Sequence, residues 1–282
     1  MKTLLTFPGA NGDTFLQWQA ARTLIHYQPG EYAVGLGTFT TKAGSMERLA
    51  PLFQKFSPVP VEVKMLEGVT AMTIGGQPWH FGLHEPPPGF DRVLHCGYQV
   101  HPLEPVAIET GRALGLTPDQ LDSIPHFPSF VVPDAPRVKR RLVFHCPLKG
   151  QTGEPAPAWR LLDTLLGRYQ LARHFDILAV GVGEELEMCR KRGLQTEEAG
   201  WERTAELLAG ADSALCGGSS VAALAGCLHT PCVRIGSQYE NDDFHAFRPW
   251  INLAPHQLTL VTSHFRMEDM AFDFLRNNRR HG

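Results

Sequence analysis

A phosphate group is the ligand suggested by a short run in the last third of the chain, made of Gly217, Gly218, Ser219 and Ser220. Glycines let a backbone approach a ligand closely, and serines favour the start of a helix. The free amides and the positive end of the helix dipole then suit an anion. No lysine follows the glycines, so this is not a Walker loop. An ordinary tight turn between a strand and a helix explains the same spacing equally well.

A second candidate lies near the amino terminus, where Gly12 and Asp13 follow a short apolar run. Gly12 gives the backbone freedom at the turn. Asp13 stands at the expected start of a helix, where the free amides and the dipole favour a carboxylate. The simplest role for Asp13 is therefore a helix cap.

The segments around both candidates predict the elements that position them. Residues 214–216, 221–228 and 232–235 read as strand, helix and strand, which is a βαβ unit around the glycine run. Residues 2–7 predict a strand, and residues 14–27 predict a helix with an apolar inner face. This alternation indicates an α/β protein with parallel sheets.

Composition limits the class of protein. The chain has 282 residues, enough for two domains, with 43% hydrophobic and 20% charged residues, as in globular proteins. A net charge of −3 gives no general attraction to nucleic acid. No apolar run approaches the ~20 residues that span a bilayer, and the amino terminus does not resemble a signal peptide. We therefore expect a cytoplasmic protein with at most peripheral membrane contact.

The six cysteines show no CxxC spacing, and several lie in apolar runs. We expect reduced, mostly buried thiols and no metal site. Two predicted strands end in the same dipeptide, His95-Cys96 and His145-Cys146. If the domains face each other, both histidines are crevice candidates, although isolated histidines are more often satisfied structural groups.

Two stretches together resemble one family. Residues 211–236 resemble the donor-binding motif of the heptosyltransferases, members of glycosyltransferase family 9 that add heptose to bacterial lipopolysaccharide. The Pro-Gly-x-x-Gly-Asp run that ends at Asp13 resembles the second signature of that family. The chain departs from the family at Gly218, where an aspartate is usual, and at Ala223, where a histidine is usual.

The resemblance implies the GT-B fold, in which two doubly wound Rossmann-like domains face each other across a cleft. We expect an acceptor-side domain at residues 1–136 and a nucleotide-sugar-binding domain at residues 137–262. Residues 263–282 are expected to form a helix that returns to the first domain. A proline-rich stretch, residues 124–136, is the expected linker.

The resemblance also implies roles for single residues. Asp13 would be the catalytic base, and the run from Gly217 to Ser220 would receive the donor diphosphate. Glu184 or Glu185, with Glu185 preferred, would hold the nucleotide ribose. The lysine that the family places two residues before Trp159 is replaced by Pro157, so Lys149 is the candidate phosphate contact. His245 lies in a stretch that would close over the donor.

The implied activity is inverting, metal-independent transfer of a sugar from a nucleotide-diphosphate sugar to a hydroxyl of a sugar or lipid-linked acceptor, without a cofactor. The oligomeric state stays open. One alternative is a degenerate protein of the same fold that binds a nucleotide or nucleotide sugar without chemistry, which Gly218, Ala223 and Pro157 favour. Another is a sugar-nucleotide epimerase or hydrolase.

Overall fold

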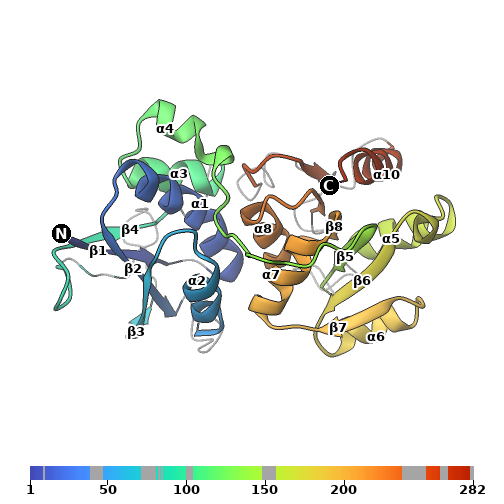
Figure 1. Ribbon diagram of the computed structural model, residues 1–282, viewed down its shortest axis with the longest axis horizontal. Helices are drawn as coiled ribbons and strands as arrows, with labels where there is room; N and C mark the ends of the chain where they lie inside the picture. The colour runs from blue at the N-terminus through green and yellow to red at the C-terminus, as the bar shows by residue number, and fades with distance from the viewer. Residues whose placement is uncertain are drawn as a thin grey trace. The chain divides into compact units, whose positions relative to one another are not determined.

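The computed structural model describes residues 1–8, 10–38, 47–70, 81, 83, 85–99, 104–147, 157–236, 252–260 and 266–279. The chain divides into two compact units, Met1–Val131 with Pro249–Ala254 and Val132–Arg248 with Pro255–Gly282. Each unit contains a parallel sheet with helices (Figure 1). The predicted α/β class with doubly wound sheets is confirmed, and the division falls slightly before the expected boundary at 136/137.

The sheet of the first unit has four parallel strands in the order β3-β2-β1-β4. The strands are β1 (Lys2–Phe7), β2 (Glu31–Thr38), β3 (Glu62–Thr70) and β4 (Arg92–His95). The chain runs from β1 outward to β3 and then crosses to the other side of β1 to form β4. The direction of winding therefore reverses between β1 and β4, which is where sheets of this type bind ligands at their carboxyl edge.

Helices of the first unit pack on β1 through an aromatic core. They are α1 (Asn11–Tyr27), η1 (Glu47–Leu49), α2 (Ala50–Phe56), α3 (Val106–Ala113), α4 (Pro118–Asp122) and η2 (Ile124–His126). Phe7, Trp18, Phe53 and Phe130 are buried and make ring contacts with one another. The Trp18 indole donates a 2.8 Å hydrogen bond to the Ser129 carbonyl, so this large side chain buries no unpaired donor. This core fixes α1, and with it the residues at the start of α1.

The sheet of the second unit has six parallel strands in the order β10-β9-β8-β5-β6-β7. The strands are β5 (Arg141–His145), β6 (Asp176–Gly181), β7 (Gln195–Glu198), β8 (Ser213–Cys216), β9 (Cys232–Ile235) and β10 (Gln257–Leu260). Numbered along the chain, this is the 3-2-1-4-5-6 order of the Rossmann sheet. The direction of winding reverses between β5 and β8, directly before the glycine run.

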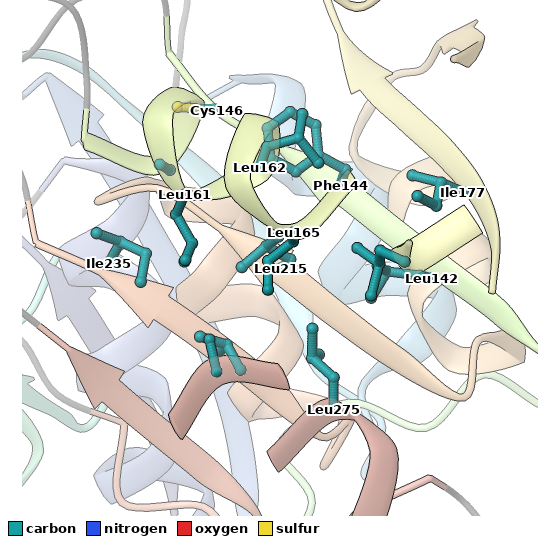
Figure 2. Close-up of a cluster of buried hydrophobic side chains, with 14 of the residues drawn as sticks. Leu142, Phe144, Cys146, Leu161, Leu162, Leu165, Ile177, Leu215, Ile235 and Leu275 are labelled. Atoms are coloured by element: carbon teal, nitrogen blue, oxygen red, sulfur yellow. The ribbon is translucent and has the colours of Figure 1, made fainter. Parts of the chain in front are cut away.

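Helices cover this sheet through alternating strand residues. They are α5 (Pro157–Gly167), η3 (Leu171–Arg173), α6 (Glu184–Arg190), α7 (Trp201–Gly210), α8 (Ser220–Cys227) and α10 (Met267–Asn277). Figure 2 shows Leu142 and Phe144 of β5 with Leu161 of α5 and Leu275 of α10 in one buried cluster. Burial of these apolar side chains is the main stabilising contribution to the unit.

The final helix, α10, packs within the second unit. Met267, Ala271 and Leu275 on the inner face of α10 lie in the core of the second unit, where α10 packs against α5 and β9. These contacts place α10 on the core of the second unit; the expected return of the chain to the first domain stays a prediction.

The segment that opens the second unit is fixed by Asp212, the residue before β8. Its carboxylate accepts hydrogen bonds of 3.2 Å from the Arg137 guanidinium and 2.8 Å from the Arg140 amide. The Arg140 side chain in turn donates to the carbonyls of Arg173 and His174. These arginines, a basic cluster in the sequence, have a structural role within the unit.

Candidate functional site

Asp13 lies in the first turn of α1, directly after the carboxyl end of β1. Its Oδ2 accepts a 2.9 Å hydrogen bond from the amide of Ala10, which closes the turn. The helix begins at Asn11, earlier than the sequence predicts, so Gly12 and Asp13 are both helical and half-buried. The carboxylate thus acts as a helix cap and still reaches solvent.

Tyr98, just beyond β4, is the second partner of Asp13. Burial, followed by the charge and the hydrogen bond of Asp13, raises the pKa of Tyr98, so the phenol stays protonated and donates to the carboxylate. Tyr98 is only 3% exposed, which fixes its hydroxyl. The Asp13 carboxylate is therefore oriented by two donors at the point where the winding of the first sheet reverses.

A cavity of about 700 Å³ opens beside Tyr98 in the first unit. Its charged lining residues are Glu104, Glu109 and Arg112. Arg112 pairs with Glu104, and the Glu109 carboxylate accepts a 2.9 Å hydrogen bond from the Gln99 amide. Arg112 balances the charge of Glu104, and the Glu109 carboxylate leaves the cavity wall net acidic.

His95 ends β4 with both ring nitrogens engaged. Nδ1 lies 2.7 Å from the Thr6 hydroxyl and Nε2 lies 3.0 Å from the Leu83 carbonyl. The ring therefore ties β4 to β1 and to the segment before β4, as expected of a structural histidine.

Gly217 lies at the corresponding edge of the second unit, where β8 ends beside β5. Its amide donates a 2.9 Å hydrogen bond to the His145 carbonyl. A Cβ atom at this position would lie 3.0 Å from Cδ of Pro147 and 3.1 Å from Sγ of Cys146. The backbone can approach the end of β5 this closely because residue 217 has no side chain.

The next three residues bring the chain into α8. Gly218, Ser219 and Ser220 are half-buried, so they are accessible, whereas Gly217 is buried. Ser219 is the N-cap residue of α8, but its side chain makes no capping hydrogen bond. Its hydroxyl instead lies 3.0 Å from Nδ1 of His145. The amides at the start of α8 are therefore not capped by this serine, which suits an anion there.

His145 and Glu185 meet at the same edge. Nε2 of His145 lies 3.9 Å from Oε2 of Glu185, and both side chains are mostly buried. Burial lowers the pKa of His145 to about 4. The imidazole is therefore neutral at neutral pH, and the contact is not an ion pair there. Burial also raises the pKa of Glu185, opposed by the hydrogen bond from the Val182 amide.

The structure distinguishes the two glutamates proposed for the ribose. Glu185 folds back over the end of β6, and a Cβ on Gly181 would lie 2.8 Å from its Oε2. Glu184 is exposed at the first position of α6. Glu185, Gly217 and Ser219 are thus brought together by His145, whereas Glu184 points to solvent. Lys149 and His245 lie outside the described residues.

Tyr98 and the central position of His145 are the features that the sequence did not reveal. The partners of Tyr98 and His145 are distant in sequence, and only the strand order brings them together. The signal available was the shared His-Cys dipeptide, which marks both strand ends.

All six cysteines are free and buried, as predicted. Within the described ranges, no three His, Cys, Asp or Glu side chains gather as a metal site would require. No helix in the part of the chain that the structure describes is both long and apolar enough to cross a bilayer.

Comparisons with known proteins give a likeness only in structure. No protein-family model matches the sequence, and no curated protein matches it. The E. coli heptosyltransferase WaaC with ADP matches with a TM-score of 0.62 at 12% identity, over 99% of this chain and 100% of that one. The E. coli ADP-heptose LPS heptosyltransferase II matches with a TM-score of 0.59 at 13% identity, over 98% of both chains.

A third solved structure, a family 9 glycosyltransferase from Veillonella parvula, matches with a TM-score of 0.55 at 13% identity, over 92% of this chain and 85% of that one. All three likenesses extend over both units. The fold is therefore the heptosyltransferase-like GT-B fold, built from two Rossmann-like units.

Proposed function

We propose that this protein is an inverting glycosyltransferase that moves a sugar from a nucleotide-diphosphate sugar to a hydroxyl of a sugar or lipid-linked acceptor. One observation carries the proposal. In the second unit, the glycine-serine run and the start of α8 lie where the winding of a Rossmann sheet reverses, between β5 and β8. This is the position at which such sheets bind nucleotides.

The second unit holds the donor in this proposal. The amides of Gly218, Ser219 and Ser220 bind the diphosphate, and the Glu185 carboxylate accepts hydrogen bonds from the ribose hydroxyls. Gly217, whose amide already donates to the His145 carbonyl, lets the run approach the end of β5. Lys149 and His245 complete the site from the segments before α5 and after β9. The E. coli enzyme WaaC is solved with ADP, so ADP is the first nucleotide to test.

The first unit supplies the base. Asp13 takes the proton of the acceptor hydroxyl as its oxygen attacks the anomeric carbon. The new C–O bond forms while the bond from that carbon to the phosphate oxygen breaks, and the electron pair leaves with the nucleoside diphosphate. Attack opposite to the leaving group inverts the anomeric centre. General-base assistance of this kind contributes roughly 10²–10⁴-fold to the rate.

The proposal assigns stabilisation of the leaving diphosphate to amides and to the dipole of α8, without a metal ion. It also places the protein in the cytoplasm, a reducing compartment that suits its six free thiols.

The test uses Asp13→Asn in the full chain, with ADP-heptose as donor and heptose-free lipopolysaccharide as acceptor. Asparagine still accepts the Ala10 hydrogen bond but is not a base. We expect kcat/KM to fall roughly 10²–10⁴-fold while the affinity for ADP stays unchanged. Asp119→Asn, an exposed carboxylate at the start of α4, is the matched control and should keep full activity. Full turnover by Asp13→Asn would remove the proposed base.

A nucleotide-sugar-binding protein without transferase activity is the second candidate. Gly218 and Ala223 favour it, because they replace the aspartate and histidine usual in the heptosyltransferases. Binding of ADP or UDP without product would support this candidate. Release of free nucleotide at full rate without an acceptor would instead indicate a hydrolase.

A further inference from the structure

Three side chains from three different strand ends converge in the second unit. His145 ends β5, Glu185 follows β6 and Ser219 follows β8. The His145 ring lies between the other two, 3.0 Å from the Ser219 hydroxyl through Nδ1 and 3.9 Å from the Glu185 carboxylate through Nε2. The roles assigned above to Glu185 and to the glycine-serine run give His145 no function.

We infer that the donor diphosphate binds together with a proton, which the His145–Glu185 pair takes up. Ser219 then directs its hydroxyl proton toward the phosphate as a hydrogen bond. The inference rests on the proposed function, because it places the diphosphate on the run from Gly217 to Ser220. It adds His145 as a positioning residue of that site and makes donor binding dependent on pH.

The electrostatics of this corner favour proton uptake when a diphosphate binds. At neutral pH the imidazole of the pair is neutral, because burial lowers the pKa of His145 to about 4. Burial also raises the pKa of Glu185, so neither group brings positive charge to the corner. A diphosphate bound beside the pair would therefore gain no positive charge from the ring unless His145 takes up a proton. An approaching anion favours the charged imidazole and so promotes proton uptake.

Among the described residues, the other charged and titratable groups near this corner include two thiols and two arginines. Arg234 of β9 lies beside Cys216, one strand further from His145 than β8. Burial raises the pKa values of Cys146 and Cys189, so both thiols are protonated. Arg192 reaches the same region, but it forms an ion pair with Asp163 through contacts of 2.6 and 3.0 Å. Among the described residues at this corner, His145 is the neutral group that can gain a positive charge by taking up a proton.

The hydrogen bond to Ser219 converts protonation into a change at the phosphate site. A neutral imidazole can accept the hydroxyl proton of Ser219 at Nδ1. A protonated imidazole carries a hydrogen at Nδ1 and donates it to the Ser219 oxygen. The Ser219 hydroxyl must then rotate and direct its own hydrogen toward another acceptor. An anion on the adjacent amides is then a suitable acceptor for that proton.

The experiment measures proton uptake on binding of ADP-glucose, whose diphosphate has no group that titrates near neutral pH. Calorimetric titrations of the full chain in buffers of different ionisation enthalpy give the number of protons bound. We expect about half a proton or more at about pH 6.5, and a Kd that rises roughly threefold to tenfold between about pH 6 and 8. His145→Gln, which can still hydrogen-bond Ser219, should bind more weakly, with no uptake and a flat pH dependence.

Two further variants sharpen the result. His95→Gln changes the equivalent strand end of the first unit and should leave proton uptake unchanged. Ser219→Ala should retain uptake but bind ADP-glucose several-fold more weakly; unchanged affinity would overturn the role of Ser219. If ADP-glucose binds with no proton uptake, or if uptake survives in His145→Gln, the inference fails and the proposed function stands. If ADP, UDP and their sugars all fail to bind, both fail together.

Discussion

Two strands, one in each unit, end in the same dipeptide, and the two histidines serve different purposes. His95 is held at both nitrogens by Thr6 and by the Leu83 carbonyl. His145 is held at one nitrogen by Ser219, while its other nitrogen lies beyond hydrogen-bonding distance of Glu185. The first ring is a structural tie, and the second can still change its protonation state.

The difference comes from the neighbouring turns. Next to His95, the turn after β1 leads into Asp13, whose carboxylate accepts hydrogen bonds from Ala10 and Tyr98. Next to His145, the turn after β8 has a glycine against the strand end and a serine that contacts the ring. The same residue pair at the same edge therefore makes different contacts according to the partners that the topology supplies.

Gly217→Val should have the largest effect on this contrast. A side chain there would meet Cys146 and Pro147, so the run must move away from the end of β5. We expect ADP affinity to fall by more than about tenfold, and unfolding free energy to fall by about 1–3 kcal/mol, as for overpacked cores. Calorimetry and urea unfolding measure the two effects. Gly200→Ala, where a Cβ meets nothing within 4 Å, is the control; equal behaviour of the two variants would contradict a preformed site.

His145→Gln should change the pH dependence of stability. The pKa of about 4 in the folded protein lies below the ordinary value of 6.5. Between these values the unfolded chain binds more protons, so this group makes stability fall as pH falls from about 6.5 toward 4. In His145→Gln, the free energy of unfolding should fall less over this pH range, by on the order of 2 kcal/mol. Urea unfolding at several pH values measures this difference.

The corresponding variant in the first unit tests the other half of the contrast. His95→Gln should lower stability already at neutral pH by about 1 kcal/mol, because Thr6 and the Leu83 carbonyl lose the ring. If the pH dependence of stability is the same in His145→Gln as in the unchanged protein, the contrast between the two histidines is contradicted.

Tyr98→Phe should have the smallest effect, and it tests how Tyr98 influences the titration of Asp13 in the first unit. The variant removes one donor to Asp13, so the ionised carboxylate loses stabilisation relative to the neutral form. The acid limb of kcat/KM should move to higher pH, with only a small change in the plateau value. Tyr32→Phe, which loses a 2.6 Å hydrogen bond to the Gln28 carbonyl in the same unit, is the control. The same shift in both variants would rule out a specific effect on Asp13.

The central strands could be predicted from sequence because they are buried on both faces. Residues 2–7 and 214–216 are apolar runs, and both form central strands. Two strands escaped prediction, β7 with the sequence QTEE and β10 with QLTL. Both lie at the edges of their sheet, where polar side chains meet solvent and the apolar signal is weak.

The candidate site was predictable as far as its turns but not in its contacts. The glycine-serine run and Asp13 could be identified because each lies in a compact local pattern. The contacts of Tyr98 with Asp13 and of His145 with Ser219 depend on which strands are neighbours. Local patterns do not encode strand order, so these contacts required the structure.

The distribution of cysteines provides an unengineered probe of motion. Cys96 lies in the first unit and the other five lie in the second, and all are shielded from solvent. A thiol reagent can therefore modify each one only after local or global opening of its surroundings. Mass-spectrometric mapping of the labelling rate of each cysteine would report local opening in each unit separately. It would also show in which unit nucleotide binding slows this opening.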